Sequence, residues 1–232
     1  QKQHWVDLIH IHIVTAVVKL CGIEQTAVNS GKNFWMSEVD NGNLAGTNAK
    51  NMGAGLSLAV NILEDMNSMQ PSAWVMWDIL DKHKDAEFVA PNGTNSEANT
   101  SNAQHIGTWG VGMVNHDTKE IELTQKYYVY GQFTKYINPG DTIIASSPTT
   151  LAAYNKDTGA IKIVAVNTTG DTQNYRFDLS AFHKTGTSAK IIRTSGSFTD
   201  GEHWKDVGTA EVKDGKFRFD LPANSVTTFV ID

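Results

Sequence analysis

The chain has 232 residues, 40% of them hydrophobic, and a formal net charge of -6. This length suits one large domain or two small ones, with enough apolar residues for a buried core. The acidic balance argues against a nucleic-acid partner, because a phosphate-binding surface needs clustered Lys and Arg. The apolar stretch at residues 9–20 is too short and too polar to span a membrane. The single cysteine, Cys21, excludes an intramolecular disulfide.

The first part of the chain predicts alternating strands and helices. Residues 32–39 and 73–79 are compact apolar runs, typical of strands that are buried on both faces of a parallel sheet. Between them, residues 48–69 place apolar side chains at helical spacing, and Pro71 ends this helix. A strand, a helix and a strand in this order predict a βαβ crossover. Residues 6–13 are a further candidate strand.

A long polar stretch, residues 81–108, follows the second predicted strand and is rich in Asn and Ser. Loops of this length in compact domains are usually functional or disordered. Residues 110–123 alternate in polarity and contain a turn signal at residues 115–117, which predicts a small hairpin. Residues 124–137 then predict a second helix.

The pattern changes near residues 137–140, after which only strands and turns are predicted. Tyr175, Phe177 and Leu179 alternate with polar residues, as half-buried antiparallel strands do. The region 141–232 therefore predicts a β-sandwich. Its expected strands are 151–156, 160–167, 174–179, 190–194, 211–220 and 226–231.

Glu38 stands where the predicted strand 32–39 ends. In parallel α/β folds, active sites gather at the carboxyl ends of the strands. A carboxylate in this position suits glycoside hydrolysis, which uses one carboxyl group as nucleophile and a second as acid/base. By position alone, a solvated or salt-bridged residue at a strand end is the commoner interpretation.

Aromatic and polar residues near the next strand are candidates for sugar binding. Trp74 and Trp77 are three residues apart and should face opposite sides of their strand, so that one can pack in the core while the other stacks on a sugar ring. Core packing of both indoles is the alternative. Asp78, His105 and Trp109 lie in or beside the long polar stretch, whose mixture of polar and aromatic groups suits sugar hydroxyls; a disordered loop is the alternative.

A metal site is not expected. His10 and His12 would share one face of a strand, but no third ligand follows at a recognisable spacing. No phosphate-binding glycine loop is present, because the glycines at positions 53 and 55 lie inside a helical pattern and follow no strand, and no cofactor is expected.

Several motifs together resemble glycoside hydrolase family 30, and most closely its endo-β-1,6-galactanase-like branch. Residues 34–40, Phe-Trp-Met-Ser-Glu-Val-Asp, are similar to the family's nucleophile strand. Residues 52–56 resemble the start of the following helix, and residues 71–77 resemble the last barrel strand. Residues 126–140 resemble the final helix and its exit, and the β-rich tail resembles the family's side domain.

The resemblance implies an α/β plus all-β fold: the C-terminal part of a (β/α)8 TIM barrel over residues 1–140, followed by an antiparallel β-sandwich side domain over residues 141–232. It implies a retaining endo-glycosidase that hydrolyses β-linked polysaccharide, and β-1,6-galactan in arabinogalactan side chains is the expected substrate. We also expect a secreted or cell-surface location in a bacterium. Glu38 matches the nucleophile and Trp77 an aromatic residue at the sugar site. Trp35 and Asp40 flank the nucleophile and are further candidates.

The family's acid/base Glu lies on an earlier strand, within an Asn-Glu-Pro-like sequence that this chain does not contain. A complete barrel also needs about 250 residues. We therefore expect an N-terminal segment that completes the barrel, and a polysaccharide or oligosaccharide as the other partner. The alternative hypothesis is a non-catalytic carbohydrate-binding or cell-surface scaffold fragment.

Overall fold

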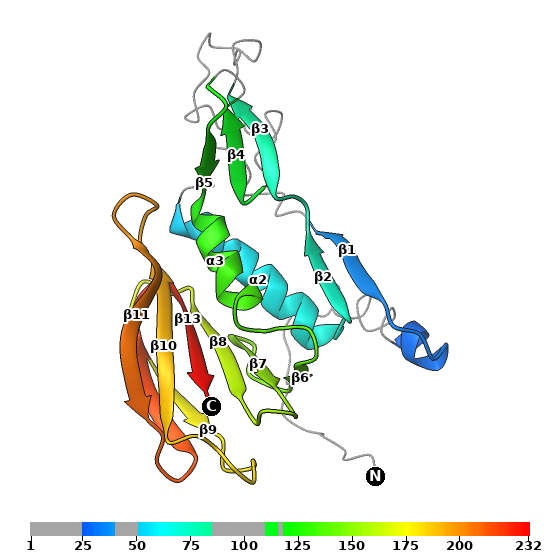
Figure 1. The fold of residues 1–232 in the computed structure, drawn as a ribbon, viewed down its shortest axis with the longest axis vertical. Coiled ribbons are helices and arrows are strands. Elements are labelled where there is room, and N and C mark those ends of the chain that lie inside the picture. The colour runs from blue at the N-terminus through cyan, green and yellow to red at the C-terminus, as the bar shows by residue number, and fades with distance from the viewer. Residues whose placement is uncertain (1–24, 40–50, 85–109, 116–117) are drawn as a thin grey trace.

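The computed structural model describes residues 25–39, 51–84, 110–115 and 118–232 (Figure 1). No helix within these ranges is long and apolar enough to cross a membrane. Several residues and segments singled out in the sequence lie outside the described ranges: the candidate strand 6–13 with His10 and His12, Cys21, Asp40, His105 and Trp109.

A parallel pair of strands and the helix between them form the first described unit. Strands β1 (Trp35–Val39) and β2 (Ala73–Met76) are paired in parallel, and helix α2 (Met52–Ser68) connects them. The βαβ prediction is confirmed. The indole Nε1 of Trp74 donates a hydrogen bond to Oδ2 of Asp65 at 2.8 Å and ties β2 to α2. Burial raises the pKa of Asp65, and this hydrogen bond lowers it in part.

The prediction that these strands are buried on both faces is wrong for the described structure. Met76 is buried and Trp74 packs against the core of which α2 forms part, whereas Trp35 and Val75 are exposed. Trp35 pairs with Ala73 and Met36 pairs with Trp74, so exposed and packed residues alternate along the strands. The cause is that α2 covers one face of a sheet with only two strands.

A small three-stranded sheet follows β2. Its strands are β3 (Leu80–Lys84), β4 (Gly112–Asn115) and β5 (Ile121–Leu123). The antiparallel β4–β5 pair confirms the predicted hairpin. Strand β3 lies in the stretch predicted as a loop, because its polar sequence has no strand pattern and its order comes from parallel pairing with β4. Helix α3 (Gln125–Thr134) then packs against α2.

The remainder of the chain forms an antiparallel sheet of six strands in the order β11-β10-β13-β8-β7-β6, and a separate antiparallel pair, β12-β9. The strands of the six-stranded sheet are β6 (Thr142–Ile144), β7 (Thr150–Tyr154), β8 (Ile161–Asn167), β10 (Ser188–Ser195), β11 (Glu202–Glu211) and β13 (Ser225–Ile231). The strands of the pair are β9 (Gln173–Asp178) and β12 (Lys216–Leu221).

The six-stranded sheet has a hydrophobic core on each face. Val164 and Val166 of β8 pack with α2 and α3, whereas Ile161 and Ile163 pack with β9 and β12. The alternation of strand side chains thus divides β8 between two cores. In Figure 1 the two helices lie between this sheet and the β1–β2 pair, and Met76 of β2 joins the helix-side core. Residues far apart in the sequence are therefore held in consecutive layers.

Two strands of the six-stranded sheet have no counterpart among the expected strands, and one expected strand begins too early. The expected strand 211–220 takes in β12 except for its last residue, but it also includes the last residue of β11 and a turn at Asp214 and Gly215, which have positive φ. Strand β11 has no clear alternation, because Trp204 and Gly208 have φ of 51° and 100° and its register with β10 shifts twice. The short strand β6 also has no sequence signal of its own.

Asp141 fixes the segment that connects α3 to the sheet. Its fully buried carboxylate accepts hydrogen bonds from Nζ of Lys162 at 2.7 Å, from Nδ2 of Asn155 at 2.8 Å and from the backbone N of Asn138 at 2.8 Å. Burial by itself would raise the pKa of Asp141, but these hydrogen bonds and the nearby ammonium outweigh it and lower the pKa. The ionised form is therefore the one that the fold stabilises.

Replacing Asp141 with Asn should lower the free energy of unfolding at pH 7 by about 3 kcal/mol, because the buried Lys162 loses its counter-ion. A group with a lowered native pKa stabilises above its unfolded pKa, and this stability is lost as the pH falls through the native pKa. The difference in free energy of unfolding between the wild type and Asp141→Asn should therefore become smaller at acidic pH. Urea unfolding at pH 7 and pH 3 measures this change in the free energy of unfolding.

Asp157→Asn, at an exposed ion pair with Lys156, is the control and should change stability by less than about 0.5 kcal/mol. A pH-independent deficit would contradict the assignment.

Candidate functional site

Two strand ends bring the candidate residues together. The backbone N of Trp77 donates to the carbonyl O of Val39 at 2.8 Å, so the ladder continues past the carboxyl end of β2. Glu38 precedes Val39 and is exposed, and Asp78 follows Trp77. Glu38, Trp77 and Asp78 therefore lie at the same edge of the parallel pair, as the sequence predicts for residues at parallel strand ends.

The two indoles of β2 and its end occupy different environments. Trp74 is half-buried against Tyr130 of α3, with ring centroids 6.0 Å apart, whereas Trp77 is 49% exposed. This matches the expectation that one indole packs while the other is accessible. The peptide bond between Trp77 and Asp78 is cis. Trp35 is 66% exposed and lies three residues before Glu38, at the amino end of β1.

Backbone hydrogen bonds connect this edge to the segment before α3. The backbone N of Val111 donates to the carbonyl O of Asp78 at 3.2 Å, and the backbone N of Gly112 donates to the carbonyl O of Ile79 at 2.9 Å. Thr124 donates to the carbonyl O of Val111 through both its backbone N, at 3.0 Å, and its hydroxyl, at 2.7 Å. The position of the strand end thus depends on how the start of α3 is held.

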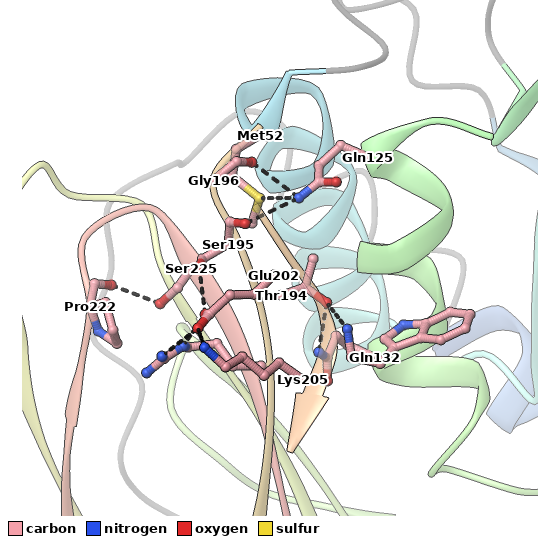
Figure 2. A network of polar contacts seen from close by, with 12 residues as sticks. Met52, Gln125, Gln132, Thr194, Ser195, Gly196, Glu202, Lys205, Pro222 and Ser225 are labelled. Carbon is pink, nitrogen blue, oxygen red and sulfur yellow. Dashed lines mark hydrogen bonds and ion pairs between the residues drawn. The ribbon is translucent and has the colours of Figure 1, made fainter. Parts of the chain in front are cut away.

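Residues that sequence reasoning did not single out hold the start of α3. Gln125, the first residue of the helix, is completely buried, and its Nε2 donates to the carbonyl O of Gly196 at 3.1 Å (Figure 2). Its Oε1 lies 3.0 Å from Nε2 of His203. A polar residue at a helix start is ordinarily solvated, and no local pattern marks Gln125 as buried, because its partners lie about 70 residues away in the sequence.

The arrangement can bring a carboxylate and a flat indole face to one ligand. Glu38 and Trp77 are both accessible at the strand ends. A carboxylate there can act as a nucleophile or a base, and an exposed indole can stack on the apolar face of a sugar ring. Within the described residues, no group of three His, Cys, Asp or Glu is placed to hold a metal ion.

No model of a protein family matches the chain. It is similar to an endo-β-1,6-galactanase of Hypocrea rufa, with 24% identity over 208 residues, which is 88% of this chain and 36% of that protein. The fold is similar to that of a glycoside hydrolase family 30 subfamily 8 xylanase from Clostridium acetobutylicum, with a TM-score of 0.62 and 25% identity over 90% of this chain and 44% of the other.

A family 30 endoxylanase from Clostridium papyrosolvens gives a TM-score of 0.61 at 20% identity and covers 94% of this chain and 46% of its own. Each likeness takes in nearly all of this chain, so it includes the strand pair, the helices and the six-stranded sheet together. The chain spans less than half the length of these three relatives. Over nearly all of its length the chain is therefore similar to glycoside hydrolases, among them members of family 30, and it corresponds to part of their length.

Proposed function

We propose that this chain is the C-terminal part of a retaining glycoside hydrolase that acts on a β-linked glycan, with Glu38 as its nucleophile. The observation that carries the proposal is the place of Glu38: an exposed carboxylate at the carboxyl end of a parallel strand, at the same edge as the accessible indole of Trp77, which directly follows β2. Active sites of parallel α/β folds lie at this edge. The named activities of the relatives favour an enzyme over a non-catalytic scaffold.

In the proposed reaction, Glu38 attacks the anomeric carbon while an acid protonates the glycosidic oxygen, and the leaving sugar departs. The resulting glycosyl ester is then hydrolysed by a water molecule, which loses its proton to the same acid/base group and frees Glu38. Two successive inversions give net retention. Trp77 would stack on the bound sugar, and Asp78 is a candidate for binding its hydroxyls.

The acid/base would come from an N-terminal segment that completes the barrel. The exposed Trp35 and Val75 lie on the strand face that α2 does not cover. A two-stranded sheet with a bare apolar face is marginal by itself in water. Further parallel strands that close the sheet into a barrel would bury this face and bring a second carboxylate to about 5–5.5 Å from Glu38, the separation that retention requires.

We propose β-1,6-galactan as the substrate because a relative that matches 88% of this chain is an endo-β-1,6-galactanase. Xylan is the competing substrate, since the family 30 structures with similar folds are xylanases. The complete protein should release oligosaccharides from β-1,6-galactan and not from xylan. NMR of the fresh products should show the β-anomer before mutarotation. First products with the α-configuration would exclude the retaining mechanism, and cleavage of xylan alone would exclude the proposed substrate.

A further inference from the structure

We infer that Gln125 is a positioning residue, through which the six-stranded sheet fixes the strand edge that carries Trp77 and Glu38. This inference rests on the proposed function for its kinetic consequence, but its structural part stands on contacts alone. Gln125 is fully buried, and the polar partners of its side chain in the described structure are Met52, Ser195, Gly196 and His203, none of which belongs to the proposed site. Its role must therefore be carried by the groups between.

The side chain of Gln125 connects α3 to three other elements of the fold. Its Nε2 faces the carbonyl O atoms of Gly196 at 3.1 Å and Ser195 at 3.5 Å, and Sδ of Met52 at 3.6 Å, the first residue of α2 (Figure 2). Its Oε1 faces the ring Nε2 of His203 at 3.0 Å. One amide group thus contacts α2, the end of β10 and the start of β11, and leaves none of its polar atoms without a partner.

On the sheet side, an ion pair and hydrogen bonds connect β10 to β11 next to this contact. Glu202 accepts hydrogen bonds from Nη2 of Arg193 at 2.8 Å and from the hydroxyl of Ser195 at 2.8 Å. These bonds connect the end of β10 to the start of β11. The hydrogen bond from Arg193 is the largest cause that lowers the pKa of Glu202, to about 2, so the carboxylate stays ionised at neutral pH. The ring of His203 stacks on Tyr128 of α3, with centroids 3.9 Å apart.

On the other side, the contact continues to the proposed site through the backbone. Gln125 directly follows Thr124, which is fully buried and binds the carbonyl O of Val111 twice. Val111 and its neighbour then bind the carbonyl groups of Asp78 and Ile79, immediately after Trp77. Every step is a hydrogen bond or a peptide bond between described residues. A shift at the start of α3 therefore reaches the strand edge.

The chain offers a matched control in Gln132. It is also fully buried on α3 and bonds to the same sheet: its Nε2 donates to Thr194 at 2.8 Å, and its Oε1 accepts from Thr228 at 2.6 Å. It lies two turns further along the helix and has no contact with the segment before α3 in the described residues. Loss of Gln132 should weaken helix–sheet packing without freeing the strand edge.

The test compares Gln125→Met with Gln132→Met in the complete protein by hydrogen exchange and steady-state kinetics. Both variants should lower the urea midpoint. Only Gln125→Met should accelerate exchange of the amides of Val111, Gly112 and Trp77, by about tenfold, while amides of β8 and β13 keep the protection seen in Gln132→Met. Only Gln125→Met should also lower kcat/KM, by about tenfold or more, since small displacements of a site are costly.

Equal exchange at these three amides in the two variants would overturn the positioning role, whatever the kinetics. If the wild-type protein cleaves no glycan, the proposed function fails, but the exchange comparison still decides the role of Gln125. Gln125→Glu tests the hydrogen-bond donor of this side chain separately from its acceptor. It keeps an acceptor for His203 but presents an oxygen to the Gly196 carbonyl, so it should free the same amides; a wild-type exchange pattern would contradict the importance of that donor.

Discussion

Glu38→Gln should abolish glycan hydrolysis by the complete protein, to below about one-thousandth of the wild-type kcat, because an amide cannot form the glycosyl ester. Glu38 is exposed, so the free energy of unfolding should change by less than about 0.5 kcal/mol. Hydrolysis of galacto-oligosaccharides and urea unfolding measure the two effects separately. The expected combination, lost turnover with an intact fold, distinguishes a catalytic carboxylate from a structural one.

Glu64→Gln is the matched control, because Glu64 is an exposed carboxylate on α2 away from the strand ends. It should leave both turnover and stability unchanged. Azide offers a second check: it can occupy the space left by Glu38→Ala, attack the anomeric carbon itself and give an α-glycosyl azide. Turnover of Glu38→Gln within tenfold of wild type would remove Glu38 as the nucleophile.

Gly131→Ala should destabilise the protein by about 3 kcal/mol, because α3 and β11 approach closely at this position. A Cβ on Gly131 would overlap the six-membered ring of Trp204. That indole cannot easily move away: its Nε1 donates to the carbonyl O of Tyr128 at 2.7 Å, and Nζ of Lys135 lies 3.9 Å from its ring centroid. The expected response is separation of the helix from the sheet edge, seen as a lower urea midpoint.

Gly53→Ala is the control for the general effect of adding a methyl group to a helical glycine. Gly53 lies in the first turn of α2, is exposed, and has nothing within 4 Å of an added Cβ. This substitution should raise stability slightly, by about 0.5 kcal/mol, because alanine restricts the unfolded chain. The two variants should therefore shift the urea midpoint in opposite directions. A neutral Gly131→Ala would show that Trp204 does not pack against α3 as described.

Much of the fold could be predicted from local patterns. The runs around Glu38 and Trp77 and the helical spacing between them indicated the βαβ order, and alternation in β9 indicated an antiparallel strand, which pairs with β12. Strands β3 and β11 could not be predicted, because β3 is polar and the positive φ at Trp204 breaks any alternation in β11. Both are ordered by pairing with a neighbouring strand, and that pairing has no local signature.

The candidate site, like the fold, could be predicted from the sequence only in part. Glu38, Trp77 and Asp78 could be named as candidates from residue type and from their positions at strand ends, which are local properties, and the resemblance of the surrounding motifs implied the nucleophile role of Glu38. Tertiary contacts were needed to show that Trp74 is the packed indole and Trp77 the accessible one, and that Gln125 is buried against carbonyl groups some 70 residues away. Burial and long-range hydrogen bonds depend on which layers meet, and that choice is made by the whole core rather than by any single segment.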